Sequence, residues 1–303
     1  MAVLKTQSLT KSYGGKRVVD NVGITVEKGD IFGLIGQNGA GKTTFMRMVA
    51  SLTAPDSGVI ELFGETDAGK VNDARSRMGC VIEAPALYGN LTAVQNLEYY
   101  RLQRGVTDEK RVHECLKIVG LEGTGKKKFK NFSLGMKQRL GLAVAILSRP
   151  DFLILDEPTN GLDPTGIIEM RDLIKQFSKE GITVLVSSHI LSELSLIANK
   201  YAIIHNGRLI KNLTHEQLQE ECKQALAITV DDVPKAAVVL ETALGISDYK
   251  QVSDNEIRIY GQVKDPAEVT FRLSQEGVRV AMVKEVGDSL EDYYTKIIGG
   301  ASQ

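Results

Sequence analysis

The chain has 303 residues, 43% of them hydrophobic and 25% charged, so it is long enough for two domains and apolar enough to bury a packed core. Its formal net charge of −1 argues against a surface built as a whole to bind nucleic acid. No apolar run reaches the roughly 18–20 residues that cross a bilayer, so any work at a membrane needs a separate subunit. The cysteines lack the spacing of metal ligands and are typical of a reducing compartment; they are Cys80, Cys115 and Cys222.

Short strands are predicted over residues 1–30, and an apolar strand over 30–35 leads into a glycine-rich segment that fits the phosphate-binding pattern G-x-x-x-x-G-K-[ST]. A helix with one apolar face is predicted directly after it. Glycines let the backbone bend tightly and point several N–H groups at one anion, and the helix adds its positive dipole end. Lys42 is suited to the β- and γ-phosphates and Thr43 to Mg²⁺. The segment consists of Gly36, Gln37, Asn38, Gly39, Ala40, Gly41, Lys42, Thr43 and Thr44.

Further along the chain, strands are predicted over 59–63 and 78–82, a largely helical region over about 89–145, and a fully apolar strand over 152–155. The last of these strands ends in Asp156 and Glu157. Carboxylates at the C-terminal edge of a parallel strand lie where ligands bind in open α/β sheets. We therefore predict that Asp156 holds a metal ion, through water, and that Glu157 polarises the attacking water.

The second half of the chain carries fewer chemical signals. An amphipathic helix is predicted around 167–177, a strand over 182–186, and a hairpin that turns at Asn206-Gly207. Residues 216–303 predict the order strand 226–230, helix 234–243, strand 248–252, strand 256–260, helix 266–275, strand 278–283 and helix 289–298. In the last strand, Val278, Val280 and Met282 are expected on one half-buried face. This βαββαβ order indicates a small ferredoxin-like domain, either a packing or dimer-stabilising domain or one that regulates or binds a partner.

Three further segments give the chain a family resemblance. Residues 131–139, NFSLGMKQR, resemble the LSGGQ signature of ATP-binding cassette (ABC) ATPases, and 160–164, NGLDP, resemble their D-loop. His189, after the strand 182–186, resembles their switch histidine. The five motifs follow the ABC order from about residue 2 to 215. The resemblance implies an α/β P-loop ABC ATPase domain over 1–215, with a parallel core sheet, an antiparallel subdomain and a helical subdomain at about 89–145. A C-terminal α+β ferredoxin-like domain over 216–303 follows.

The resemblance also implies a mechanism. ATP with Mg²⁺ would lie between the phosphate loop of one copy and the signature of a second copy, in a head-to-tail dimer, and hydrolysis would loosen that dimer. Lys42, Glu157 and His189 are the expected catalytic residues, and Thr43, Glu83 and Asp156 the expected metal ligands. The nucleotide contacts would come from the phosphate loop together with Tyr13, whose ring would stack on adenine, Ser133, Leu134, Gly135 and Asp163.

Two departures from the family pattern narrow the resemblance. Glu83 follows the strand 78–82 where most ABC domains have glutamine; a carboxylate accepts hydrogen bonds and ligates Mg²⁺ but cannot donate as an amide does. The signature keeps Ser133 and Gly135 but has Leu134 and Met136 at the variable positions. Together these features resemble the ABC subunits of bacitracin resistance and lantibiotic immunity. They imply an exporter ATPase with a separate transmembrane permease, located in the cytoplasm on the inner face of the membrane, with no nucleic-acid partner.

Other functions remain open at this point. The chain could serve another drug or lipid export system, or act as an ATP-gated assembly module with little turnover, although the retained Glu157 and His189 argue against the second. ABC proteins that act on ribosomes typically carry two cassettes in one chain, whereas this chain has one phosphate loop. DNA-repair ABC ATPases insert a long coiled coil before the signature, whereas fewer than 100 residues separate Thr44 from Asn131 here.

Overall fold

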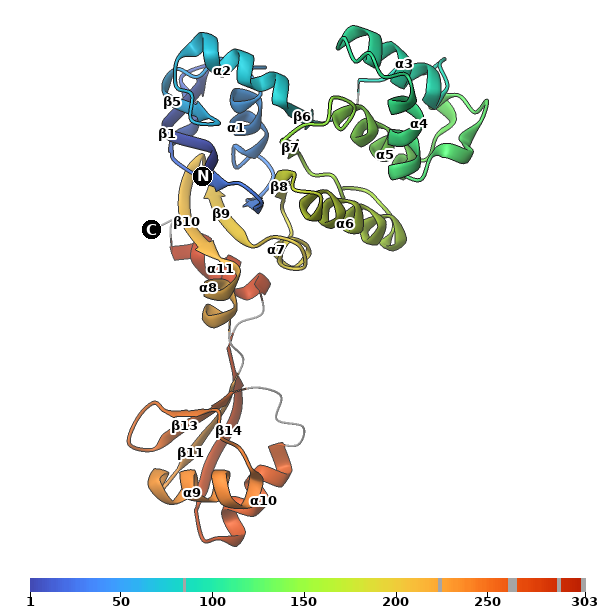
Figure 1. The fold of residues 1–303 in the computed structure, drawn as a ribbon. Helices are drawn as coiled ribbons and strands as arrows, with labels where there is room; N and C mark the ends of the chain where they lie inside the picture. Colours follow the sequence, from blue (N-terminus) through green and yellow to red (C-terminus); the bar gives the residue numbers. More distant parts are fainter. Residues whose placement is uncertain (84–85, 223–224, 261–265, 288–289, 301–303) are drawn as a thin grey trace. The chain divides into compact units, whose positions relative to one another are not determined.

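The computed structural model describes residues 1–83, 86–222, 225–260, 266–287 and 290–300. The chain divides into two compact units, Met1–His215 and Glu216–Gln303 (Figure 1). Among the helices of the described ranges, none combines the length and the apolar character that a bilayer span requires.

A six-stranded sheet forms the centre of the first unit, with strand order β10-β9-β4-β8-β7-β6. All neighbouring pairs from β9 to β6 are parallel, and β10 is antiparallel to β9. Every residue of β4, β7 and β8 is buried, as expected for strands covered on both faces. Their C-terminal ends therefore meet at one edge. The strands are β4 (Ile31–Ile35), β6 (Met78–Val81), β7 (Phe152–Leu155), β8 (Thr183–Ser188), β9 (Lys200–His205) and β10 (Arg208–Thr214).

The β9–β10 hairpin turns where the sequence predicts it. Asn206 has φ +50° and Gly207 has φ +79°, the paired positive values that a two-residue hairpin turn needs. The turn also contacts the phosphate loop, because the Gly207 N–H donates to the Ala40 carbonyl at 2.9 Å and its carbonyl accepts from the Asp20 N–H at 2.8 Å. The hairpin thus braces the phosphate loop from one side.

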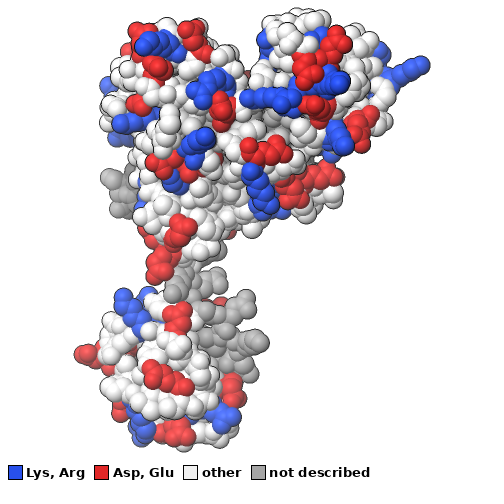
Figure 2. Space-filling view, in the orientation of Figure 1, with Lys and Arg blue, Asp and Glu red and all other residues white. Residues whose placement is uncertain are grey.

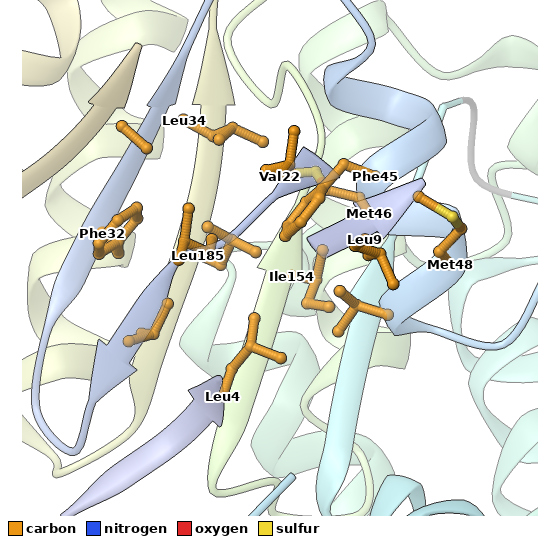
Figure 3. Close-up of a cluster of buried hydrophobic side chains, with 14 of the residues drawn as sticks. Leu4, Leu9, Val22, Phe32, Leu34, Phe45, Met46, Met48, Ile154 and Leu185 are labelled. Atoms are coloured by element: carbon orange, nitrogen blue, oxygen red, sulfur yellow. The ribbon is translucent and has the colours of Figure 1, made fainter. Parts of the chain in front are cut away.

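An antiparallel sheet packs with α1 in the main core of this unit. Figure 3 shows Phe45, Met46 and Met48 of α1 among Leu4 and Leu9 of β1 and side chains of the parallel sheet. All three α1 residues are completely buried, so α1 is fixed at the end of β4. The antiparallel strands are β1 (Ala2–Tyr13), β2 (Lys16–Val22), β3 (Thr25–Glu27) and β5 (Ser57–Leu62). The helices are α1 (Lys42–Val49), α2 (Ala68–Ala74), the 3₁₀ turn η1 (Arg75–Arg77), α6 (Pro164–Lys179) and α7 (Leu191–Ser195).

A helical region lies between β6 and β7 in the sequence. Thr92 opens it with a capping box, in which its hydroxyl accepts from the Gln95 N–H while the Gln95 side chain accepts from the Thr92 N–H. The elements are α3 (Ala93–Gln103), α4 (Lys110–Ile118), the 3₁₀ turns η2 (Glu122–Thr124) and η3 (Phe129–Asn131), and α5 (Leu134–Ala145).

The second unit has an antiparallel sheet of order β12-β13-β11-β14. With helices after its first and third strands, this is the ferredoxin-like βαββαβ arrangement. Apolar residues of α9 and α10 pack against one face of the sheet. The elements are α8 (His215–Glu221), β11 (Ala225–Val230), α9 (Val233–Leu244), β12 (Tyr249–Gln251), β13 (Glu256–Tyr260), α10 (Pro266–Gln275), β14 (Val280–Val286) and α11 (Leu290–Gly300). Position 289, where the last helix was expected to begin, lies outside the described residues.

The expected face of the last strand is wrong at Met282. The register of β14 against β11 shifts between Val280 and Met282, which is the mark of a β-bulge. A shift by one residue turns the following side chains over, so Met282 is exposed and Val283 packs against the core instead. Val278, buried, precedes the strand rather than belonging to it. The regular alternation of buried and exposed side chains expected from the sequence is therefore interrupted at this bulge.

Candidate active site

The phosphate loop joins β4 to α1 and is closely confined by backbone. A Cβ on Gly36 would lie 2.5 Å from the carbonyl oxygen of Ile204, and a Cβ on Gly41 would lie 2.4 Å from that of Val18. Gly41 also has φ +107° and occupies the N-cap position of α1, where it offers no side-chain acceptor to the first N–H groups. Since no side chain of the described residues caps them, these N–H groups and the positive end of the helix suit an anion.

Lys42 points back into the loop that precedes it. Its side chain is 5% exposed, and its Nζ donates to the Gly36 carbonyl at 2.6 Å and to the Gln37 carbonyl at 3.3 Å. The same Nζ lies 3.0 Å from Oε1 of Glu157. The ammonium is thus held by two carbonyls and one carboxylate, and phosphate oxygens entering the loop would compete with Glu157 for it.

Thr43 and Asp156 meet at the base of the loop. The Thr43 hydroxyl donates to Asp156 Oδ2 at 2.7 Å, and the Asp156 carboxylate is almost fully buried. A hydroxyl and a carboxylate beside a phosphate site are the hard oxygen donors that Mg²⁺ prefers, so these residues fit that ion. In the part of the chain that the structure describes, no group of three or more His, Cys, Asp or Glu side chains could hold a metal by itself. Mg²⁺ would therefore complete its coordination with water and phosphate oxygens.

Glu157 lies between Lys42 and His189. While Oε1 faces Lys42, Oε2 lies 2.8 Å from Nδ1 of His189. An ionised carboxylate only accepts, so Nδ1 carries the hydrogen of this bond and Nε2 is the nitrogen left for other contacts. Glu157 has φ +47°, in the left-handed region, and precedes Pro158. Residues before proline avoid helical backbone angles, so this conformation is strained and needs support from its neighbours.

Glu83 lies beside α1 rather than on the Thr43–Asp156 pair. Its carboxylate forms an exposed ion pair with Arg47, at 3.4 Å, and its backbone has φ +62°. The Glu83 side chain is 56% exposed. In the described residues no hydrogen bond connects Glu83 with Thr43 or Asp156, so its expected role as a metal ligand stays a prediction.

Tyr13 stands at the end of β1 with its side chain 48% exposed. The ammonium of Lys11 lies 5.5 Å from the centre of its ring, a cation–π distance. An exposed aromatic ring is suited to stacking on a base, and the stacking of Tyr13 on adenine stays a prediction.

The signature and the D-loop touch each other. Ser133 caps α5, its hydroxyl accepting from the Met136 N–H at 3.3 Å, and the Leu134 side chain is 47% exposed. Asp163 caps α6 in the same way, accepting from the Gly166 N–H at 2.9 Å. A Cβ on Gly161 would lie 2.9 Å from Cδ2 of Leu134, so the two loops pack together.

The structure brings most of the expected catalytic residues together but leaves the signature apart from them. Glu157 contacts both Lys42 and His189, and Thr43 is hydrogen-bonded to Asp156. Across the described ranges, no hydrogen bond joins Ser133 to the phosphate loop of its own chain.

Two polar contacts near these residues were not expected from the sequence. Ser187, fully buried at the end of β8, donates to Asp156 Oδ1 at 2.6 Å and accepts from the Glu157 N–H at 2.8 Å. Thr159 donates to Glu193 of α7 at 2.8 Å, which connects the residues after Glu157 to those after His189. A pair of serines ending an otherwise apolar strand was the available signal for the first contact.

The chain is similar to known ATP-binding proteins of transporters. Residues 19–160 match the family model described as ABC transporter. The bacitracin transport ATP-binding protein BcrA of Bacillus licheniformis is 43% identical over 99% of this chain and 98% of its own length. The lantibiotic transport ATP-binding protein SrtF of Streptococcus pyogenes is 44% identical over 69% of this chain and 89% of its own. A solved ATP-binding subunit of an ABC transporter is 30% identical over 72% of this chain and 92% of its own, with a TM-score of 0.65.

Proposed function

Because this chain belongs to the ABC transporter family as an ATP-binding subunit, we propose that it powers the export of peptide antibiotics of the bacitracin or lantibiotic class. The observation that carries the proposal is the length of the similarity to BcrA, which runs through both units of the chain. A similarity limited to the ATPase unit would support ATP hydrolysis but not a particular cargo. Glu83 and the Ser-Leu-Gly-Met signature point to the same subfamily.

The geometry of the site supports ATP hydrolysis by a water aligned at Glu157. Lys42 and the N–H groups at the start of α1 would hold the β- and γ-phosphates, and Thr43 and Asp156 would hold Mg²⁺, which neutralises phosphate charge. Glu157 would take the proton of the attacking water, and His189 would contact the γ-phosphate. Since Lys42 binds Glu157 directly, transfer of the ammonium to the phosphates would release the carboxylate for this work.

The same proposal includes a head-to-tail dimer. Ser133 begins α5 with its hydroxyl at the helix N-terminus, a position suited to phosphate oxygens, and Leu134 beside it is exposed. The signature of one copy would close over the ATP held by the phosphate loop of the other. Asp163, at the start of α6, would line the same interface, and Tyr13 would stack on the adenine.

A separate transmembrane permease would be the second partner and would place this chain on the inner face of the membrane. The charge distribution is compatible with protein partners rather than nucleic acid. On the face seen in Figure 2, Lys and Arg alternate with Asp and Glu over the described residues of each unit. Nucleic-acid binding depends mainly on clustered positive charge.

The test is resistance in a sensitive host. Expression of this chain with its permease should raise the inhibitory concentration of bacitracin or of a lantibiotic such as nisin, and Lys42→Ala should abolish the gain. The chain should enter the membrane fraction only when the permease is present. Unchanged resistance to both peptide classes, with active ATPase and an intact complex, would contradict the proposed cargo and favour another drug or lipid.

A further inference from the structure

Ser187 connects the carboxylate of Asp156 to the backbone of Glu157 through one hydroxyl group. It donates to Asp156 Oδ1 at 2.6 Å and at the same time accepts from the backbone N–H of Glu157 at 2.8 Å. Its side chain is fully buried, so water has no access to replace either bond. Both partners are adjacent residues at the end of β7, while Ser187 comes from the neighbouring strand β8.

The hydrogen bond from Ser187 to Asp156 is the second one that orients this carboxylate. Oδ2 accepts from Thr43 and Oδ1 accepts from Ser187, so hydroxyl groups on two different elements define the plane of the carboxylate. Without Ser187, Asp156 would keep one bond and could rotate about it. A ligand that rotates holds Mg²⁺ or its water less precisely, because supporting hydrogen bonds orient metal ligands.

The bond to Glu157 supports a strained backbone. At φ +47° and before a proline, Glu157 occupies a conformation that side-chain-bearing residues rarely adopt. Ser187 Oγ holds its N–H, and this fixes the direction from which the side chain leaves. From there the carboxylate reaches both Lys42 and His189.

We infer that Ser187 is a positioning residue for ATP hydrolysis, which aligns the metal-side carboxylate of Asp156 and the water-side carboxylate of Glu157 together. The inference rests on the proposed roles of these two carboxylates. The position needs a small group that donates and accepts at once, which alanine or valine cannot do. Ser187 therefore acts on turnover rather than on nucleotide affinity, since Lys42 and the loop N–H groups are not among its partners.

The test compares Ser187→Ala with Thr183→Val in the purified chain. Thr183 lies at the opposite end of β8, is equally buried, and uses its hydroxyl to accept from the Gly29 N–H at 3.0 Å, away from the site. Both variants lose a buried hydroxyl and should lose stability. Only Ser187→Ala should lower kcat, by about tenfold or more because a small misplacement of reacting groups is costly, and raise the Mg²⁺ concentration needed for half-maximal rate. The ATP dissociation constant should stay within about threefold.

Two further variants make the result decisive. Ser187→Cys keeps a small side chain with a weak donor, so its kcat should lie between those of wild type and Ser187→Ala. This variant also tests the inference if Ser187→Ala does not fold. In a Glu157→Gln background, Ser187→Ala should lower the residual rate far less than in the wild-type background, because both changes affect one step. A kcat within twofold of wild type in folded Ser187→Ala, or parallel losses in Thr183→Val, would overturn the inference. Normal turnover by Glu157→Gln alone would instead contradict the role proposed for Glu157.

Discussion

Leu134 of the signature packs against Gly161 of the D-loop, so closely that a methyl group on Gly161 would lie 2.9 Å from its Cδ2. Two loops assigned to the dimer interface are therefore coupled inside one chain. A movement of the D-loop after hydrolysis would reach the signature directly.

Gly161→Ala is expected to disturb this contact. The substitution places a side chain at φ +75°, which costs on the order of 1 kcal/mol, and also pushes Leu134. Gly181→Ala is the matched control, because Gly181 has φ +91° but nothing within 4 Å of its added Cβ. Urea denaturation should show a lower free energy of unfolding for both variants. ATPase activity should fall only for Gly161→Ala, and adding Leu134→Ala should change the size of that fall. Equal ATPase rates in the two glycine variants would argue against coupling.

Glu157→Gln should slow ATP turnover by about a hundredfold or more, since general-base catalysis contributes at least that much in many enzymes. ATP binding should be preserved or tightened, because the variant removes an anion that holds Lys42 at 3.0 Å. With ATP present the variant should accumulate as a dimer in size-exclusion chromatography. Glu180→Gln, at the end of α6, serves as the control and should hydrolyse and elute like wild type. Near-normal hydrolysis by Glu157→Gln would refute the general-base assignment.

Lys42→Ala should weaken ATP binding by roughly 1–3 kcal/mol, the range for a charge-assisted hydrogen bond, in isothermal titration calorimetry. The lysine is buried among loop carbonyls, so the circular dichroism spectrum and thermal midpoint must be compared in parallel. Lys70→Ala, which removes an exposed lysine from α2, is the control and should bind ATP normally. An unchanged ATP affinity in folded Lys42→Ala would contradict the predicted role.

Glu83→Gln tests the expected metal ligand that follows β6. ATP affinity should stay within a few-fold and the ATPase rate of the isolated chain should change little, because Lys42 and the loop N–H groups dominate phosphate binding. Resistance to the exported peptide should fall, since we propose here that the carboxylate connects the Mg²⁺ site to the permease.

Arg47→Gln distinguishes the proposed role of the Glu83 carboxylate from a role of its ion pair with Arg47. The ion pair between Arg47 and Glu83 is largely exposed, and such pairs contribute about 1 kcal/mol or less. Arg47→Gln should therefore leave resistance nearly intact. If it reproduces the loss seen in Glu83→Gln, the ion pair rather than the metal or the permease explains Glu83. If both variants keep wild-type resistance, Glu83 is a neutral replacement.

Cys115 predicts a pH dependence of stability. Burial raises the pKa of its thiol to about 11, from about 9 for the same group in water. Between these values the unfolded chain loses the thiol proton while the folded chain keeps it, so the free energy of unfolding falls as pH rises. The contribution is on the order of 1–2 kcal/mol across this window. The stability difference between wild type and Cys115→Ala, from urea denaturation at several pH values, should shrink from pH 9 to 11. A stability difference that stays constant from pH 9 to 11 would contradict the predicted pH dependence.

Much of the nucleotide site was predictable because its residues sit at strand ends. The strands around Ile35 and Leu155 are short, fully apolar runs, and the parallel arrangement brings the residues after them to one edge. The contacts between motifs were not predictable in the same way. Ser187 was expected just beyond its strand, whereas it is part of β8 and is hydrogen-bonded to residues about thirty positions away. Spacing in one sequence carries no information on such pairings.

In the ferredoxin-like unit, too, the pairing of distant segments could not be predicted from the sequence. Its βαββαβ order follows from alternating strand and helix patterns, and helix 266–275 agrees with α10 to the residue. The bulge before Met282 leaves no local mark, because the alternation of Val278, Val280 and Met282 is consistent with a regular strand. Only the pairing with β11 reveals which side chains face the core.

The left-handed backbone of Glu157 has a consequence for how this protein can be stabilised. Glycine at that position would adopt φ +47° without penalty, so Glu157→Gly should relieve the local strain while it removes the carboxylate. The loss of the contact with the buried Lys42 ammonium opposes this gain, so heat resistance at this position is a balance between backbone strain and charge pairing. A library selected for heat resistance should be assayed for turnover as well, because any chain that gains stability by losing this carboxylate is expected to be inactive.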